Sequence, residues 1–67
     1  MPETMTYKEA REAKGLKAQF VAAQLGMTKA NYSLKENYKR NFKTDEIYKF
    51  AEIVGIRIDQ LKIKEDS

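Results

Sequence analysis

A chain of 67 residues is long enough for one domain with a modest core, and it leaves little room for a concave substrate site. It contains no cysteine and no histidine, which excludes disulfides, thiolate chemistry, and both the commonest general base and the commonest zinc ligand. The 13 basic and 10 acidic residues give a net charge of +3, and no acid–base arrangement typical of an enzyme is recognisable. We therefore expect no catalysis, metal, cofactor or small-molecule substrate.

The N-terminal residues lack the apolar stretch of a signal peptide, and no apolar run approaches the length of a membrane span. We expect one domain over residues 1–67, with residues 1–5 and 62–67 as flexible tails. The expected location is the cytoplasm, without a membrane partner.

The first predicted helix begins after Thr6 and runs to about Lys14. Thr6 and Glu9 have the spacing of a capping box, in which each side chain accepts from the other's free amide. Gly15 then takes the left-handed conformation that ends many helices. The second helix is expected over residues 18–25.

Two further helices are predicted from capping residues and apolar spacing. Thr28 caps a third helix to about Asn37, and Thr44 caps a fourth to Val54. Residues 37–43 between them are polar and basic, which indicates a loop. Asp59 opens a short fifth helix containing Leu61, although the alternation over residues 61–64 also permits a strand that pairs across a dimer.

Charge is distributed unevenly along the chain. Residues 28–43 hold five basic residues and one acid, whereas residues 44–67 hold four basic residues and six acids. A basic segment on one face is typical of a surface that binds phosphate groups, and a solvated lysine-rich surface is the alternative.

The segment from residue 18 to 37 carries the strongest functional pattern. Two short helices meet at a tight turn, so they must cross steeply, and the small Ala22 permits their close approach. Gly26 supplies the positive φ that the turn needs. The outer face of the second helix can then enter a major groove. The residues that lock the two helices together are Val21, Ala22, Leu25, Gly26, Met27 and Tyr32.

These residues, in this order and at this spacing, resemble the phage-repressor-like (Cro/cI-type) helix-turn-helix family. The resemblance extends from about Tyr7 to Leu61. It implies an all-α fold, a compact bundle of about five short helices like the lambda-repressor DNA-binding domain, in a bacterial cell or a phage-infected host. It also implies a partly buried ion pair between Arg11 and Glu36. The matching residues are Gly15-Leu16, Val21-Ala22, Leu25-Gly26-Met27-Thr28, Glu36, Phe50-Ala51, Val54-Gly55-Ile56 and Leu61.

The resemblance further implies which residues contact DNA. Lys29 would donate to guanine, Ala30 and Leu34 would touch thymine methyl groups, and Ser33 would serve either base. Asn31 completes the base-contact set of Lys29, Ala30, Asn31, Ser33 and Leu34. The implied phosphate contacts, which position the protein without reading sequence, are Lys17, Asn37, Tyr38, Lys39, Arg40 and Lys43.

The chain departs from the family at several positions. Ala18 replaces a glutamine that contacts phosphate, and Phe20 replaces a polar residue. Lys35 stands at an apolar position, so either its stem covers the core with the ammonium in water, or the helix is rotated and Leu34 is partly buried. Tyr38 and Phe42 replace the family's common glycine and proline, so a differently shaped loop is expected.

The predicted function is a sequence-specific regulator that binds double-stranded DNA, as a Cro-like repressor. We expect a homodimer on a two-fold operator, formed in free solution or only on DNA, with Ile56, Ile58, Leu61 and Ile63 as self-association candidates or as caps of the core. One alternative is a protein-interaction module that binds through Phe20 and Leu34. Another is single-strand binding, with bases stacked on Tyr38 and Phe42 among the loop cations.

Overall fold

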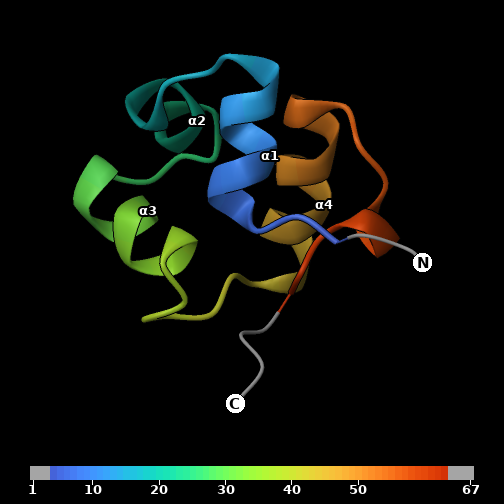
Figure 1. The fold of residues 1–67 in the computed structure, drawn as a ribbon. Coiled ribbons are helices and arrows are strands. Elements are labelled where there is room, and N and C mark those ends of the chain that lie inside the picture. The colour runs from blue at the N-terminus through green and yellow to red at the C-terminus, as the bar shows by residue number, and fades with distance from the viewer. Residues whose placement is uncertain (1–3, 64–67) are drawn as a thin grey trace.

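The computed structural model describes residues 4–63 and consists of helices packed around one core (Figure 1). α1 spans Tyr7–Lys14, α2 spans Ala18–Gln24, α3 spans Lys29–Glu36, α4 spans Thr44–Val54, and a 3-10 turn, η1, spans Ile58–Gln60. The all-helical fold predicted from the sequence is confirmed. Within residues 4–63, none of the helices combines the length and apolar character needed to cross a membrane.

The predicted signals at the helix ends are largely confirmed. Thr6 and Glu9 form the capping box of α1, with hydrogen bonds of 3.1 and 3.0 Å between each backbone amide and the other's side-chain oxygen. Gly15 ends α1 in the left-handed conformation, at φ 79°. Thr28 accepts from the amide of Asn31 at 3.1 Å and caps α3 as expected.

Two helix ends differ from the prediction. Thr44 is the first residue of α4 and does not cap it. The preceding residue, Lys43, is the N-cap, and its amide donates to Glu46 at 2.9 Å. Glu46 therefore accepts from the backbone amide of the N-cap residue at the start of α4. Leu61 lies outside the last helical turn in an extended conformation, because η1 ends at Gln60.

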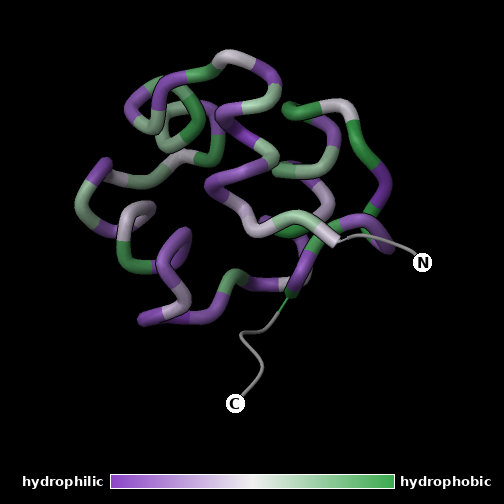
Figure 2. The backbone as a smooth tube through the Cα atoms, in the orientation of Figure 1, coloured by the Kyte–Doolittle hydropathy of each residue, from purple (hydrophilic) through white to green (hydrophobic). Residues whose placement is uncertain are grey.

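The core is built from side chains of all four helices and the loop before α4. Hydrophobic residues recur at intervals along the chain (Figure 2), and every helix contributes some of them to the core. Tyr7 is at the centre of an aromatic cluster: its ring lies 4.5 Å from Phe42 and 5.2 Å from Phe50, both edge-on. Burial raises the pKa of Tyr7 to about 12. The buried hydrophobic residues are Tyr7, Ala10, Val21, Ala22, Tyr32, Phe42, Phe50, Ala51, Val54 and Leu61.

The two ends of the described chain are joined by a short parallel bridge between Met5 and Leu61. The amide of Met5 donates to Gln60 and the amide of Lys62 donates to Met5, each at 2.8 Å. The tails predicted over residues 1–5 and 62–67 were therefore too long at their inner ends, since Met5 and Lys62 belong to this bridge. Leu61, the first residue of the alternating segment, pairs within the chain. Residues 1–3 and 64–67 lie outside the described part, so the rest of the predicted tails and the end of that segment are not described.

Candidate nucleic-acid interface

The turn between α2 and α3 holds the two helices in the arrangement that the sequence predicts. Gly26 has φ 73°, and the amide of Met27 reaches back to the carbonyl of Ala22 at 3.0 Å. Val21 and Ala22 are buried, so the first helix of the pair is fixed against the core. The small side chain of Ala22 lets the turn fold close to α2, and α3 then begins directly after Thr28.

The inner and outer faces of α3 are clearly separated. Tyr32, Lys35 and Glu36 are buried at helical spacing, and Tyr32 has no exposed surface. On the other side, Leu34 keeps 41% of its surface exposed. Leu34 is therefore exposed to solvent on the outer face of α3. The predicted base-contact residues on this side are exposed (Lys29, Ala30 and Leu34) or partly exposed (Asn31 and Ser33).

Lys35 shows which of the two predicted registers α3 adopts. Its stem is buried, as the first alternative requires, but its ammonium pairs with Glu46 at 2.7 Å and lies 5.9 Å above the ring of Phe42. The helix is not rotated, and Leu34 stays on the outside. The sequence did not single out Glu46 as this partner, and its position three residues after the N-cap of α4 was the available signal.

Glu46 lies in the first turn of α4, and its carboxylate accepts hydrogen bonds from two donors. Burial raises its pKa, but the hydrogen bonds from Lys35 and from the amide of Lys43, together with the charges of the two lysines, keep the pKa below its ordinary value. Glu46 is therefore charged near neutral pH, and the pair with Lys35 joins α3 to α4.

Arg11 and Glu36 form the ion pair implied by the family resemblance. Arg11 Nε lies 2.7 Å from Glu36 Oε2, and Arg11 Nη1 donates to the carbonyl of Leu16 at 2.8 Å. The hydroxyl of Tyr32 also donates to Glu36, at 3.2 Å. The hydrogen bond to Glu36 is the main cause that raises the pKa of Arg11. One guanidinium thus connects α1, the turn before α2 and the end of α3.

The loop after α3 begins with a Schellman motif that has tyrosine where glycine is usual. Tyr38 has φ 65°, and its amide donates to Lys35 at 3.1 Å. The amides of Lys39 and Arg40 both donate to the carbonyl of Leu34, at 2.8 and 3.2 Å. The backbone of the two cations is therefore fixed directly to the last turn of α3.

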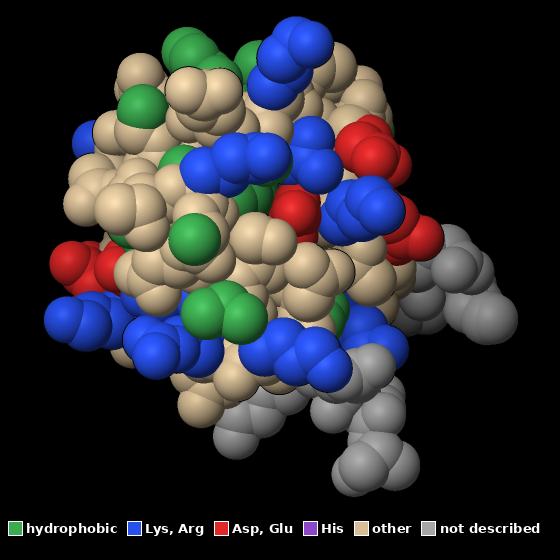
Figure 3. All heavy atoms as spheres, turned by 90° about the vertical axis from the view of Figure 1, so that its left-hand side faces the viewer, with side chains coloured by type: hydrophobic (Ala, Val, Ile, Leu, Met, Phe, Trp, Pro, Cys, Tyr) green, Lys and Arg blue, Asp and Glu red, His purple; other side chains and the backbone are tan. Residues whose placement is uncertain are grey.

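The predicted phosphate contacts lie at the N-cap of α2 and in the segment that joins α3 to α4. Figure 3 shows that Lys and Arg side chains gather across the lower part of the side on which α2 and α3 lie, next to hydrophobic side chains. Lys17 is exposed at the N-cap of α2, which has no side-chain cap. Asn37 is exposed as well, although its Nδ2 donates to the carbonyl of Ser33 at 2.8 Å. The exposed cations of this set are Lys17, Lys39, Arg40 and Lys43.

Two loop aromatics do not take the positions expected for ligand contacts. Phe42 is 8% exposed inside the aromatic cluster, so it is not available to stack a base. The side chain of Tyr38 is partly buried, with its ring 5.4 Å from that of Tyr7 and its hydroxyl donating to the carbonyl of Lys62. Tyr38 was predicted to contact a phosphate, and its side chain instead joins the loop to the C-terminal segment. The burial of Phe42 removes one of the two rings on which single-strand binding by stacking would depend.

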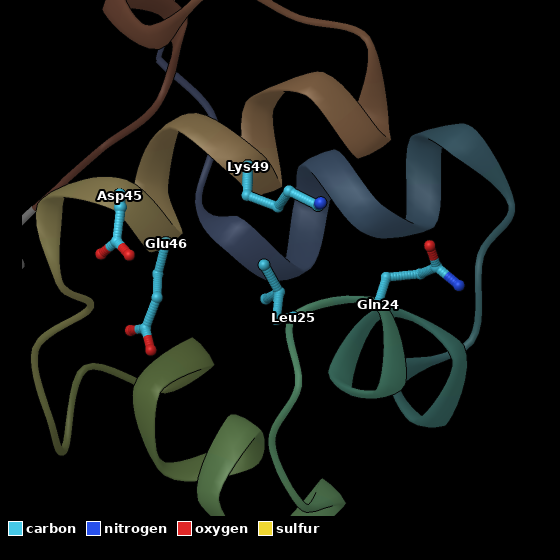
Figure 4. Close-up of a pocket in the computed structure, with 5 residues that line it drawn as sticks. All are labelled: Gln24, Leu25, Asp45, Glu46 and Lys49. Carbon is cyan, nitrogen blue, oxygen red and sulfur yellow. The ribbon is translucent and has the colours of Figure 1, made fainter.

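A shallow hollow of about 300 Å³ lies between the C-terminal end of α2 and the start of α4 (Figure 4). In Figure 4, the carboxylate of Glu46 points toward α3. Because that carboxylate accepts a hydrogen bond from Lys35, the Glu46 side of the hollow belongs to the packing of α3 on α4. Within residues 4–63, no group of three potential ligands could hold a metal ion. The residues that line the hollow are Gln24, Leu25, Asp45, Glu46 and Lys49.

Comparison with known proteins identifies one match. A family model described as helix-turn-helix matches residues 8–61, which includes α2, α3, α4, η1 and all of α1 except its first residue, Tyr7. Neither the curated proteins nor the solved structures yielded a match to this chain.

Proposed function

Because the chain belongs to the Cro/cI-type helix-turn-helix family of DNA-binding regulators, we propose that it is a Cro-like repressor that binds a two-fold operator as a homodimer. The observation that supports this proposal best is the outward face of α3. Its register is held by the buried residues Tyr32, Lys35 and Glu36, while Leu34 remains exposed. A helix presented in this way can lie in a major groove.

The side chains divide into two roles in the proposed complex. Lys29, Ala30, Asn31, Ser33 and Leu34 face the base edges, and the exposed cations Lys17, Lys39, Arg40 and Lys43 lie beside the phosphates. Asn37 is a further candidate for a phosphate contact. The fixed backbone at Lys39 and Arg40 supports this division, because it limits the ordering that binding must impose on the loop.

A homodimer supplies the affinity that one small module lacks, since two half-sites bury twice the DNA surface. Of the four aliphatic candidates for self-association, Leu61 is buried and Ile56 and Ile58 pack partly against the core. Ile63 keeps 37% of its surface exposed. We therefore propose Ile63 as the side chain of this group that contacts the second copy.

Titration with random-sequence duplex DNA, followed by backbone amide NMR shifts at low and moderate salt, tests the proposed function. We expect shifts at Lys17, over residues 29–34 and over residues 37–43, which fade as salt rises because released counterions drive non-specific binding. Absence of shifts at low salt contradicts the proposal.

Charge removal gives a second test with a matched control. Lys39→Ala and Arg40→Ala should each weaken binding to all duplexes and reduce the slope of log K against log salt by about 1. Lys8→Ala removes an exposed charge from α1, outside the predicted contact set, and should leave the slope unchanged.

A second candidate function is a protein-interaction module, and the exposure of two large apolar side chains favours it. Phe20 is 48% exposed and Leu34 is 41% exposed. If the domain binds a protein and not DNA, the duplex titration shows no shifts, and Leu34→Glu abolishes association with the protein partner.

A further inference from the structure

Tyr38 has a backbone conformation that residues with a Cβ rarely adopt. Its φ of 65° lies in the left-handed region, where the Cβ approaches the carbonyl oxygen too closely. Within residues 4–63, it is the one residue other than glycine with a positive φ. Such a conformation persists where the surrounding structure imposes it, commonly at sites that bind a ligand or transmit a change. The contacts that impose it on Tyr38 therefore indicate what this residue does.

The side chain of Tyr38 is held by the C-terminal segment, residues 61–63, which the fold brings beside the loop between α3 and α4 (Figure 1). The hydroxyl of Tyr38 donates to the carbonyl of Lys62, and its ring lies 5.4 Å from that of Tyr7. The hydroxyl of Tyr7 donates to the next carbonyl, that of Ile63, at 3.4 Å. Two tyrosines thus attach consecutive peptide groups of this segment to the rest of the domain.

The backbone of Tyr38 leads directly into two exposed cations of the loop, Lys39 and Arg40. Their amides donate to the carbonyl of Leu34 at 2.8 and 3.2 Å, and the amide of Tyr38 donates to the carbonyl of Lys35 at 3.1 Å. These hydrogen bonds depend on the positive φ of Tyr38, since the two soft dihedrals of a residue set the direction of the chain that follows. One residue therefore connects the C-terminal segment to both cations.

We propose that Tyr38 is the positioning residue of the cationic loop, and that its hydrogen bond to the C-terminal segment keeps Lys39 and Arg40 in place for phosphate contacts. The inference rests on the proposed DNA-binding function and adds a coupling between two surfaces, the loop and the segment that carries Ile63. Coupling of this kind is reciprocal, so DNA bound at the loop also stabilises the segment. Because Ile63 is proposed to contact the second copy, the same hydrogen bond strengthens association of the two copies on DNA.

Tyr38→Phe tests the inference, because it removes the hydrogen bond and keeps the ring. Ile53→Val is the control for loss of stability alone, since it removes one methyl group packed on the core from the second half of α4. The first measurement is amide hydrogen exchange without DNA. In Tyr38→Phe the amides of Lys39 and Arg40 should exchange several-fold faster relative to that of Met27, whereas Ile53→Val should leave this ratio unchanged.

The second measurement is the dissociation constant for duplex DNA, at a temperature where every variant is folded. Tyr38→Phe should weaken binding to all duplexes about threefold, because the coupling cannot exceed the roughly fivefold factor of one hydrogen bond. Ile53→Val should bind as the wild type does. The loss from Tyr38→Phe should disappear in a variant that already carries Lys39→Ala and Arg40→Ala, since Tyr38 acts through these two cations. A loss that persists there contradicts the proposed role.

The amide of Ile63 reports the coupling directly, because it belongs to the same peptide group as the carbonyl of Lys62. During duplex titration its NMR shift should move in the wild type and stay constant in Tyr38→Phe. A shift that persists in Tyr38→Phe, unchanged exchange at the loop amides, or unchanged DNA affinity overturns the inference, while duplex binding itself upholds the proposed function. If no duplex binds at low salt, both proposals are wrong.

Discussion

The ammonium of Lys35 lies 2.7 Å from the carboxylate of Glu46, although Lys35 stands at a position of α3 that faces the core. The next residue, Glu36, pairs with Arg11 on α1. Two adjacent residues of opposite charge thus attach the end of α3 to two different helices. This arrangement holds the outer face of α3 in place through charge as well as through apolar packing.

Replacing Glu46 and replacing Lys35 should lower the free energy of unfolding by unequal amounts. Glu46→Gln leaves the buried ammonium without a counter-charge and should lower the free energy of unfolding by about 2 kcal/mol. Lys35→Met fills a similar volume and leaves Glu46 bonded to the amide of Lys43, so it should cost less than about 1 kcal/mol. Urea denaturation of both variants checks this, and a larger loss in Lys35→Met than in Glu46→Gln would contradict it.

Acid should destabilise the domain partly through Glu46. Its pKa is lowered on folding, so the folded state binds the proton less readily than the unfolded state does. The stabilisation is complete above the ordinary pKa of 4.5 and is lost as pH falls through the lower folded value. Denaturation curves between about pH 3 and 6 should therefore have a smaller slope of stability against pH in Glu46→Gln than in the wild type.

The Arg11–Glu36 pair should show strong coupling in a double-mutant cycle. Arg11→Met leaves the Glu36 carboxylate with the hydrogen bond from the Tyr32 hydroxyl but without its counter-charge, and it should cost about 3 kcal/mol or more. The double variant Arg11→Met with Glu36→Leu removes both charges and should be more stable than Arg11→Met alone. Additive losses in the cycle would show that the two charges act independently.

The hydroxyl and the ring of Tyr38 should contribute different amounts to the free energy of unfolding. Tyr38→Phe removes the hydrogen bond to Lys62 and should cost about 1 kcal/mol, whereas Tyr48→Phe, at an exposed site, should change little. Tyr38→Gly relieves the positive φ by about 1 kcal/mol but loses ring packing worth about 2 kcal/mol. The midpoint temperature of thermal unfolding should therefore be lower for Tyr38→Gly than for the wild type. A higher midpoint would show that backbone strain dominates.

Alkaline conditions should unfold the domain through its buried tyrosines. The pKa of Tyr7 rises from 10.0 to about 12 on folding, so its stabilisation is complete below pH 10.0 and is lost as pH rises through the folded value. Tyr7→Phe cannot ionise, and its stability should decline less over this range. Circular dichroism at increasing pH checks the difference, and parallel declines would assign the loss to other groups.

Local signals in the sequence were sufficient for most of the fold. The Thr6 capping box, the glycine after α1 and the spacing of Tyr32 and Glu36 each depend on neighbours within a few residues, so their structural consequences were predictable. The position of Lys35 was ambiguous because its partner, Glu46, lies eleven residues away on another helix. Pattern analysis identifies a charged residue at a core position, but it does not identify which side chain compensates that charge.

The loop was harder to predict than the helices. Polar and basic neighbours of Tyr38 and Phe42 favoured an exposed loop, yet both rings pack against Tyr7. Their burial depends on Tyr7, which lies far away in the sequence. Likewise, the bridge between Met5 and Leu61 joins the two ends of the described chain, where no local pattern predicts pairing.

Leu34 uses its backbone and its side chain for two separate tasks. Its carbonyl accepts the amides of Lys39 and Arg40, whatever side chain is attached, while its side chain lies on the outer face of α3. If Leu34 contacts bases as proposed, a point mutation at this position alters the preferred sequence without displacing the cationic loop. Under the proposed function, single substitutions at position 34 would change the operator while the phosphate contacts are retained, so this position is the first to randomise in order to change the DNA sequence that the protein prefers.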